Sequence, residues 1–224
     1  MQKDQRSSPR LADVPWMQGM PKEVRTAFDR ALRVRALQAG QLLTELGEPA
    51  QSLIGVKAGA IALHTDDVES QDIVGHIMWP GDWYGVATIL TDVPRVLGSS
   101  ALTDASVYVL TRSAVERLAE EHPIFWRAAA VLASLNAMLA TRIARDNLLR
   151  SPTEKCTATL DRLIGRQSLP CDLPITQSQF AHICGLSRGA VAKVLSELER
   201  AGKTSRRYSA IRVEAGFRSS TNQE

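Results

Sequence analysis

The spacing of apolar and polar positions gives the first part of the chain a short, strand-like period. Between Val34 and Leu110, brief apolar stretches are separated by turn residues such as Gly47, Gly59 and Pro80–Gly81–Asp82. Many short strands at this spacing are typical of a small antiparallel barrel or jelly roll. The predicted strands are Gln41–Leu46, Leu53–Val56, Ala60–His64, Ile73–Met78 and Ser106–Leu110.

The period becomes helical after this region. Ser113–Glu116 reads as a capping box, in which each side chain satisfies a free backbone N–H of the first helical turn. After Pro123, the segment Ile124–Arg150 has no internal Gly or Pro, and its apolar stripe is wider than one neighbour requires. We therefore expect one face to lie on the barrel and the other to bind a second copy of the chain. Asn136 either fixes the register of that two-stranded seam or faces water. The predicted contacts between copies are Val131, Leu132, Leu135, Met138, Leu139 and Ile143.

A further boundary follows the long helix. Ser151 is a good N-cap, Pro152 suits the first helical position, and Glu154 completes a capping box. A new domain is therefore predicted to start here, with its first helix from Cys156 to Ile164. The two prolines of Arg166–Pro174 predict that this stretch is a loop.

The next segment has the spacing of a helix-turn-helix. Thr176–Gln179 is a capping box that predicts the start of a short helix, and Ser187 caps a second one. Ala181, Gly185 and Val191 follow one another at separations of four and six residues. The helix crossing needs a small residue, the turn needs a left-handed backbone, and the valine closes the core. This pattern is typical of DNA-binding helix-turn-helix motifs.

Charge strengthens the DNA-binding interpretation. The chain has 27 Lys and Arg against 24 Asp and Glu, and residues 151–224 hold 11 of the basic and 7 of the acidic ones. A basic end on a neutral body is what contact with phosphates requires, although a solvated charged face has the same composition. Lys203–Val213, with Arg206 and Arg207 at the expected hairpin tip, is predicted to form a basic wing.

The sequence also resembles a known family. ITQSQFAHICGLSRGAVAKVLSELERAG is similar to the DNA-binding end of the Crp–Fnr regulators, the cyclic-AMP receptor protein and its relatives. GQLLTELGEPAQSLIGVKAGAIAL and PGDWYGVATIL resemble the sensory barrel of that superfamily. The resemblance covers nearly the whole chain and implies an α+β fold. It implies a jelly-roll sensory domain with flanking helices over 1–122, a dimerisation helix over 123–150 and a winged helix-turn-helix over 151–224.

The resemblance also implies a function. Such a protein is a dimeric, sequence-specific transcription regulator rather than an enzyme, with double-stranded DNA and RNA polymerase as partners and a palindromic operator. Arg188 would bond a guanine bidentately, although a plain phosphate contact is the alternative. Many relatives have Glu where this chain has Gly189, which cannot read a base. The predicted DNA-binding residues are Thr176, Gln177, Ser187, Arg188, Gly189, Lys193, Arg206 and Arg207.

The cyclic-nucleotide signature of the superfamily is incomplete here. Relatives that bind cyclic nucleotides carry a Gly-Glu pair and, some ten residues later, an Arg-Ser pair that holds the phosphate. In this chain Val86 replaces the Glu, and a gapless count puts Val96 and Leu97 at the Arg-Ser position. Arg95 is one residue off, which on a strand reverses its face. We therefore expect no tight binding of cyclic AMP. The predicted effector pocket consists of Trp83, Gly85, Val86, Arg95, Val96 and Thr141.

Other cofactors are not expected. Iron–sulfur relatives use N-terminal cysteines, but the first of three cysteines here is Cys156. Haem would need His64 or His76, and a lone histidine in a strand is more often structural. A jelly-roll metalloenzyme would need a His-x-His cluster, which is absent, so no metal site is predicted. The remaining alternative to an effector-sensing regulator is the same scaffold without ligand, controlled by its abundance.

Cys184 and the N-terminal end of the chain give two further expectations. Cys184, directly before the turn glycine, is expected to pack as a small apolar residue rather than to act as a redox switch. The N-terminal residues 1–10 are polar, and no apolar run reaches the length of a membrane helix. We therefore expect a frayed N-terminal tail and a cytoplasmic protein without membrane contact.

Overall fold

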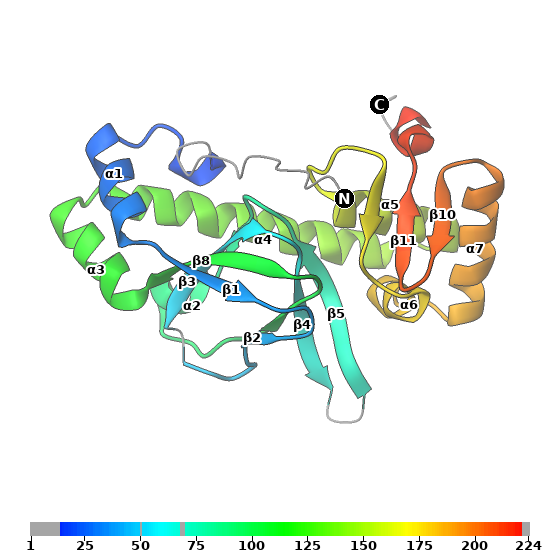
Figure 1. The fold of residues 1–224 in the computed structure, drawn as a ribbon, viewed down its shortest axis with the longest axis horizontal. Coiled ribbons are helices and arrows are strands. Elements are labelled where there is room, and N and C mark those ends of the chain that lie inside the picture. Colours follow the sequence, from blue (N-terminus) through cyan, green and yellow to red (C-terminus); the bar gives the residue numbers. More distant parts are fainter. Residues whose placement is uncertain (1–13, 50, 68–69, 221–224) are drawn as a thin grey trace. The chain divides into compact units, whose positions relative to one another are not determined.

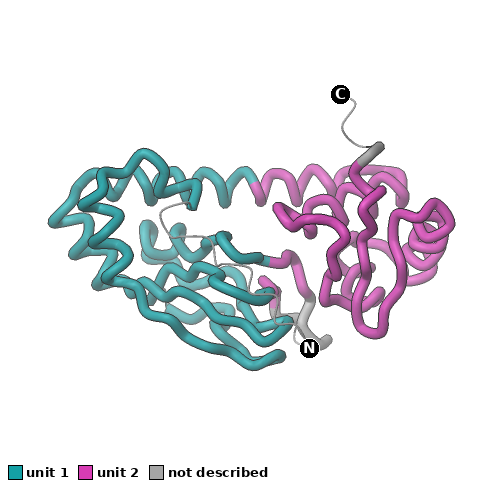
Figure 2. The backbone as a smooth tube through the Cα atoms, turned by 45° about the horizontal axis from the view of Figure 1, so that its top comes forward, with its two compact units in different colours: residues 1–61, 78–138 teal, residues 62–77, 139–224 magenta. Residues whose placement is uncertain are grey.

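The computed structural model describes the chain as two compact units (Figure 2). They consist of residues 1–61 with 78–138 and of residues 62–77 with 139–224. The structure describes residues 14–49, 51–67 and 70–220. The predicted frayed tail at the N-terminus lies outside these described residues.

The first unit is built on a four-stranded antiparallel sheet with the order β1-β8-β3-β6 (Figure 1). Strand β8 pairs with β1 from Arg33↔Val109 to Leu37↔Ala105, and its other edge pairs with β3. Along β8, the buried Ala105 and Val107 alternate with the half-buried Ser106 and Tyr108, whereas Leu110, on the other face, is buried in the apolar cluster of the first unit. The strands are β1 (Arg33–Leu37), β3 (Ser52–Ala58), β6 (Trp83–Tyr84) and β8 (Ala105–Thr111).

A second four-stranded sheet has the order β2-β7-β4-β5. Its strands are β2 (Leu42–Thr44), β7 (Gly98–Ala101), β4 (Ile61–Asp67) and β5 (Ser70–Met78). All five predicted strands are present, and the predicted antiparallel, jelly-roll-like architecture is confirmed. Strands β1, β6 and β7 were not predicted.

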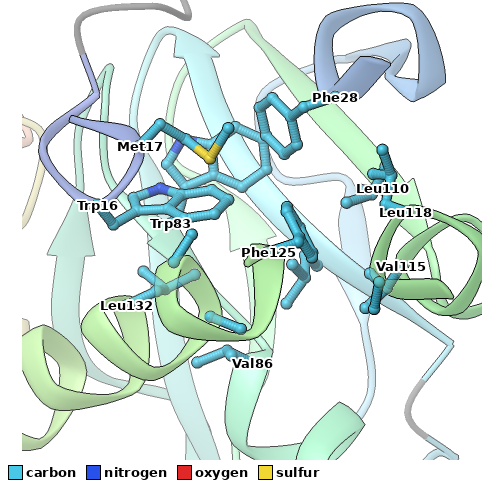
Figure 3. Close-up of a cluster of buried hydrophobic side chains, with 14 of the residues drawn as sticks. Trp16, Met17, Phe28, Trp83, Val86, Leu110, Val115, Leu118, Phe125 and Leu132 are labelled. Atoms are coloured by element: carbon cyan, nitrogen blue, oxygen red, sulfur yellow. The ribbon is translucent and has the colours of Figure 1, made fainter. Parts of the chain in front are cut away.

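An aromatic cluster forms the core of the first unit (Figure 3). Trp16 contacts the rings of Phe28 and Trp83 edge-on, at centroid distances of 5.2 and 5.4 Å, and Phe125 closes the group. Offset and edge-on ring pairs of this kind stabilise a core beyond the area that they bury. The helical elements that supply or cover this core are η2 (Pro15–Met17), α1 (Lys22–Ala31), α2 (Val86–Thr91), α3 (Arg112–Glu121) and the first part of α4 (Phe125–Leu148).

Helix α3 begins earlier than the sequence predicted. Thr111 is its N-cap, and the Thr111 hydroxyl accepts a hydrogen bond from the Ala114 N–H at 3.3 Å. Ser113 therefore lies inside the first turn, and the predicted capping box at Ser113–Glu116 is wrong. Strand β8 runs directly into the helix, so that the cap sits at the last residue of the strand.

The second unit contains the winged helix-turn-helix that the sequence predicted. The Ser151 hydroxyl accepts from the Glu154 N–H, as expected of an N-cap, and Pro152 opens the first helix. The helices are α5 (Pro152–Ile164), α6 (Gln177–Cys184) and α7 (Arg188–Arg200), followed by the short η3 (Ala215–Ser220). A three-stranded sheet has the order β10-β11-β9, with β9 (Cys171–Leu173), β10 (Thr204–Arg207) and β11 (Ala210–Val213). Strand β9 lies within the stretch Arg166–Pro174 that was predicted to be a loop.

Candidate nucleic-acid interface and effector pocket

The turn between α6 and α7 has the geometry that the sequence predicted. Thr176 and Gln179 form a reciprocal capping box, in which the Thr176 hydroxyl accepts the Gln179 N–H at 3.2 Å. Gly185 has a φ of +59°, so the left-handed turn needs a residue without a side chain. Ser187 then caps α7 by accepting from the Ala190 N–H at 3.2 Å. Local hydrogen bonds therefore fix the start of both helices.

Helix α7 buries one side and exposes the other. Its apolar residues Val191, Val194, Leu195 and Leu198 are all buried in the second unit. Arg188 and Gly189, in the first turn, and Lys193, one turn later, are exposed. Gly189 and Lys193 are four residues apart and so share one face of the helix. The helix therefore presents the predicted base-facing residues to the surroundings.

The wing differs in detail from the prediction. Arg207 pairs with Ala210 across the hairpin, so the tip consists of Tyr208 and Ser209. Arg206 is not at the tip, and its side chain points back to α7. Its Nε donates to Glu199 Oε2 at 2.8 Å, and its backbone N–H donates to Glu199 Oε1 at 2.8 Å. Both this hydrogen bonding and the Glu199 charge raise the pKa of Arg206. The bonds to Glu199 anchor the wing to α7.

Tyr208 is a surface residue that the sequence prediction missed. Its side chain is fully exposed at the wing tip, next to the exposed Arg207. An aromatic residue between a basic pair and a turn residue was the available signal, because aromatic rings beside cations are common in nucleic-acid binding. Within the described residues, the side chains of Arg188, Lys193, Arg207 and Tyr208 have no hydrogen bond or ion pair. Three cationic side chains are therefore left to meet an anion from outside.

Thr176 and Gln177 lie at the start of α6 and, unlike Arg188, Lys193 and Arg207, carry no charge. The Thr176 hydroxyl accepts from the Gln179 N–H and donates to Gln179 Oε1 at 3.1 Å, so it is used by the cap. Gln177 is half-buried at the first position of α6. The open backbone N–H groups of a capped helix start are suited to a phosphate.

Cys184 is fully buried in the second unit and lies next to Cys156 of α5. The hydrogen bond that the Cys184 thiol donates to Cys156, followed by burial, raises the pKa of Cys184 above its usual range. A thiol that stays protonated and buried is a poor nucleophile. These properties support the packing role that we expected for Cys184.

Arg95 lies inside the first unit, contrary to the expectation that it faces away. It is 5% exposed, whereas Val96 is 68% exposed. The expected reversal of its face assumed a strand, but Arg95 lies in the connection between α2 and β7. Hydrogen bonds from Gly47 N to Arg95 O (2.8 Å) and from Arg95 N to Glu48 O (3.0 Å) fix this connection. Val96 therefore does not line the pocket.

The Arg95 guanidinium is already bonded within the chain. Its Nε donates to Glu48 Oε1 at 2.8 Å, and an Nη donates to the Ser52 carbonyl at 3.0 Å. Gly85 lies beside it with a φ of +91°, and a Cβ added there would come within 2.8 Å of the Ser52 oxygen and 3.1 Å of Arg95 Nη1. Gly85 is therefore required for the close approach of backbone and guanidinium.

A buried polar chain accompanies this site. The Tyr84 hydroxyl donates to Ser99 Oγ at 2.9 Å, and Ser99 Oγ lies 2.6 Å from Thr44 Oγ1. Burial raises the pKa of Tyr84 above its usual range, with a smaller, lowering effect of the Arg95 charge. These residues, like Glu48 and Ser52, were missed because their partners are distant in sequence.

The other predicted pocket residues do not join Arg95. Val86 is buried in the apolar cluster of the first unit, where it offers no hydrogen-bond acceptor. Trp83 belongs to the same cluster and stacks on Tyr108 with the ring centroids 6.1 Å apart, so it is a core residue (Figure 3). Thr141 is exposed on the part of α4 that belongs to the second unit.

Helix α4 has two apolar faces. Phe125, Ala128 and Leu132 are buried in the core of the first unit, whereas Val131 and Leu135 are about two-fifths exposed. Met138 is 67% exposed, and Leu139, Ile143 and Asn136 are half-buried. Leu132, which was predicted to contact a second copy, is 2% exposed and contacts its own chain instead.

The described residues bear on metal binding and on membrane insertion. Within them, no group of three or more His, Cys, Asp or Glu side chains is arranged to hold a metal ion. None of the helices in the described ranges combines the length and apolar character needed to cross a membrane.

Family models match both parts of the chain. Residues 34–122 match the cyclic nucleotide-binding domain, and residues 147–215 match the Crp-like helix-turn-helix domain. The HTH-type transcriptional regulator Cmr of Mycobacterium tuberculosis is 27% identical over 175 residues, which cover 78% of this chain and 70% of that protein.

Solved structures share the fold. The c-di-GMP-responsive global regulator CLP of Xanthomonas campestris has a TM-score of 0.68 and 17% identity, over 87% of this chain and 99% of that one. FixK2 of Bradyrhizobium japonicum also has a TM-score of 0.68, with 18% identity over 81% of this chain and 92% of that one. At these identities the likeness concerns the order and arrangement of the elements.

Proposed function

This chain belongs to the Crp–Fnr superfamily of transcription regulators, and from that premise we propose that it binds a palindromic DNA site as a homodimer. The observation that carries the proposal is the exposed start of α7, where Arg188 and Lys193 have no partner among the described residues. Arg188 has the planar donor pair that matches guanine O6 and N7. Lys193 would reach a second base or a phosphate, and Arg207 and Tyr208 would contact the backbone beside it.

The DNA site follows from dimer symmetry. Two recognition helices related by a two-fold axis enter successive major grooves about 34 Å apart. DNA sites selected by the protein from a random library should therefore be palindromes, with half-sites one helical turn apart. Selected sites without a repeat, or binding that does not depend on sequence, would refute the proposal.

The exposed apolar face of α4 supports self-association. At about 100° per residue, Val131, Leu135 and Met138 lie within one narrow sector of the helix. The sector of Leu132, which is buried in its own chain, is turned by roughly 90° from that face. A line of apolar side chains with this exposure is typical of a helix that packs against a second helix.

Sedimentation velocity at micromolar concentration tests the dimer. Leu135→Glu would bury an unpaired charge in the seam and should yield monomers. Ala130→Glu is the matched control, because Ala130 is exposed on another side of α4 and should leave the dimer intact. A wild-type protein that sediments as a monomer would contradict the proposal.

The barrel is the proposed sensory domain. Through Arg95 the barrel would recognise an anionic effector, because such an anion could take the place of Glu48. We propose that cyclic nucleotides are not tightly bound, since the position of the ribose acceptor is held by the apolar, buried Val86. Isothermal titration is the test, and a low-micromolar dissociation constant for cyclic AMP or cyclic GMP would overturn this part. We propose no haem or iron–sulfur cluster either.

The Arg95–Glu48 pair also favours a second candidate, the same regulator acting without any ligand. The guanidinium is neutralised inside the protein, so the barrel does not need an external anion to fold. Native mass spectrometry of the protein purified from its own cells distinguishes the two, because it reports bound ligand and subunit number together. RNA polymerase in the cytoplasm is the partner that the family resemblance proposes for either form.

A further inference from the structure

Three buried polar side chains lie outside both sites described above. Asp146 comes from α4, Arg162 from α5 and His76 from β5, and all three belong to the second unit. Arg162 Nε donates to Asp146 Oδ2 at 2.9 Å, and Arg162 Nη1 lies 3.1 Å from His76 Nδ1. The side chains of Arg162 and Asp146 are each 1% exposed. One guanidinium thus joins two helices and a strand.

The contact with His76 has a definite direction. A guanidinium can only donate, so Nδ1 of His76 accepts and the imidazole is neutral with its proton on Nε2. Burial, together with the charges of Arg162 and Arg142, lowers the pKa of His76 to about 3. The histidine therefore remains an acceptor at neutral pH, and protonation does not break its hydrogen bond with Arg162 in that range.

Stability alone is a poor explanation for this chain of bonds. A buried ion pair is often no more stable than apolar side chains of the same volume, because both charges lose their hydration. The same two helices are also joined by Arg142 and Asp161, at 2.6 Å and with partial exposure. The buried chain differs from that pair in reaching a third element, β5.

Strand β5 leads directly to the Arg95 site. After His76 the chain passes through Met78 and the turn at 79–82 into β6, and Gly85 follows nine residues after His76. The turn is firmly held, since Val56 N donates to Asp82 O at 2.9 Å and Gly81 N donates to Val56 O at 3.0 Å. At the other end, α5 packs on α6 and α7.

We propose that the Asp146–Arg162–His76 chain couples the Arg95 site to the recognition helix, with Arg162 as the positioning residue. A displacement at Gly85 moves β6 and β5, and His76 passes it through Arg162 to α5 and so to α7. Directional bonds suit this role, because they have one geometry, whereas an apolar contact would tolerate sliding. The inference rests on the proposed DNA binding, which supplies its readout.

Thermodynamic reciprocity makes the coupling testable although the effector is unidentified. If an effector at the Arg95 site changes DNA affinity, DNA must change the affinity of that site for the effector by the same factor. DNA binding should therefore also alter β5 and β6, the strands that lead to the site. Hydrogen–deuterium exchange of the full chain, with and without a DNA site selected by the wild-type protein, measures this in peptides covering 70–85. We expect DNA to change exchange there by about fivefold or more in the wild type.

Two variants separate coupling from support. His76→Phe keeps a ring of similar size but removes the acceptor, and should lose the DNA-dependent change at 70–85 while still binding DNA. Arg142→Gln, which breaks only the partly exposed pair, should retain the change. If His76→Phe does not fold, Arg162→Lys takes its place, because it keeps the charge but has one nitrogen where the guanidinium uses two, Nε for Asp146 and Nη1 for His76.

The outcomes are distinct. An unchanged exchange rate in the wild type on DNA binding, or an equal change in wild type and His76→Phe, overturns the coupling. A wild-type protein that selects no DNA site overturns the proposed function itself, and fluorescence anisotropy shows this before any exchange is measured.

Discussion

Two of the arginine sites of this chain, one in each unit, hold their charge in opposite ways. Arg188 and Arg207 of the second unit are exposed and make no ion pair within the described residues. Arg95 of the first unit is buried and bonded to Glu48 and Ser52. An exposed cation costs little to keep and remains available to a polyanion, whereas a buried one must have its counter-charge nearby. The Arg95 site depends on Glu48 for charge neutralisation, and the site of Arg188 and Arg207 needs no such partner.

The sharpest way to break this contrast is to remove the internal counter-charge. Glu48→Ala leaves the buried Arg95 guanidinium without an anion, and the free energy of unfolding should fall by about 3 kcal/mol. Urea denaturation measures it. Glu45→Ala is the control, because Glu45 is exposed in the same stretch of chain and should change the stability little. Equal stability of the two variants would show that Glu48 does not support Arg95.

The exposed site should respond in the reverse manner. Arg188→Ala should lower the affinity for the selected DNA by about 1–3 kcal/mol, through one guanine per half-site. Its free energy of unfolding should stay within about 0.5 kcal/mol of the wild type. Binding assays on matched and scrambled DNA provide the measurement. A loss that is equal on both DNAs would make Arg188 a phosphate clamp and leave base reading to Lys193 or DNA shape.

A buried histidine should make the stability of the protein depend on pH, unlike the exposed arginines. Folding lowers the pKa of His76 from 6.5 to about 3. Between these two pH values His76 is protonated in the unfolded chain and neutral in the folded one. The stability that this contributes is complete above pH 6.5 and is lost as the pH falls toward 3. Between pH 7 and pH 5.5 the free energy of unfolding should drop by about 1 kcal/mol from this group. Urea denaturation of His76→Phe should lack this part of the pH dependence, and an unchanged dependence would contradict it.

The smallest effect separates two neighbouring arginines of the wing. Arg207→Ala should weaken binding alike on all DNA sequences and lower the salt slope by about one, as one phosphate contact is lost. Arg206→Ala should leave the slope unchanged, because Arg206 is held by Glu199. Affinities over a salt series decide it. A lower slope in both variants would mean that Arg206 leaves Glu199 for the DNA.

Features that depend on neighbouring residues could be predicted from the sequence. The caps at Ser151, Thr176 and Ser187 and the left-handed Gly185 each involve only a few consecutive residues. Thr111 and Ser113 are equally good caps by composition, and only the end of β8 decides between them. Strand β7 reads Gly-Ser-Ser-Ala, which has no apolar alternation to reveal it.

Contacts between distant residues could not be predicted in this way. Arg95 and Glu48 are 47 positions apart, and the residues around either one do not indicate that the other is its partner. The count that placed Val96 in the pocket allowed no gap, and the reversed face of Arg95 assumed a strand, whereas the backbone there is an irregular connection. Asp146, Arg162 and His76 come from three elements, and their meeting depends on the packing of all three.

The open position at Gly189 bears on how such a regulator changes over generations. A side chain added there would meet no atom within 4 Å, so the fold accepts almost any replacement. Replacing a helical glycine even gains up to about 1 kcal/mol of helix stability. Single-base changes in a glycine codon lead to acidic, basic and small residues, each of which would meet a different base edge in the groove. One point mutation could thus move the protein to a new set of genes without an intermediate that fails to fold.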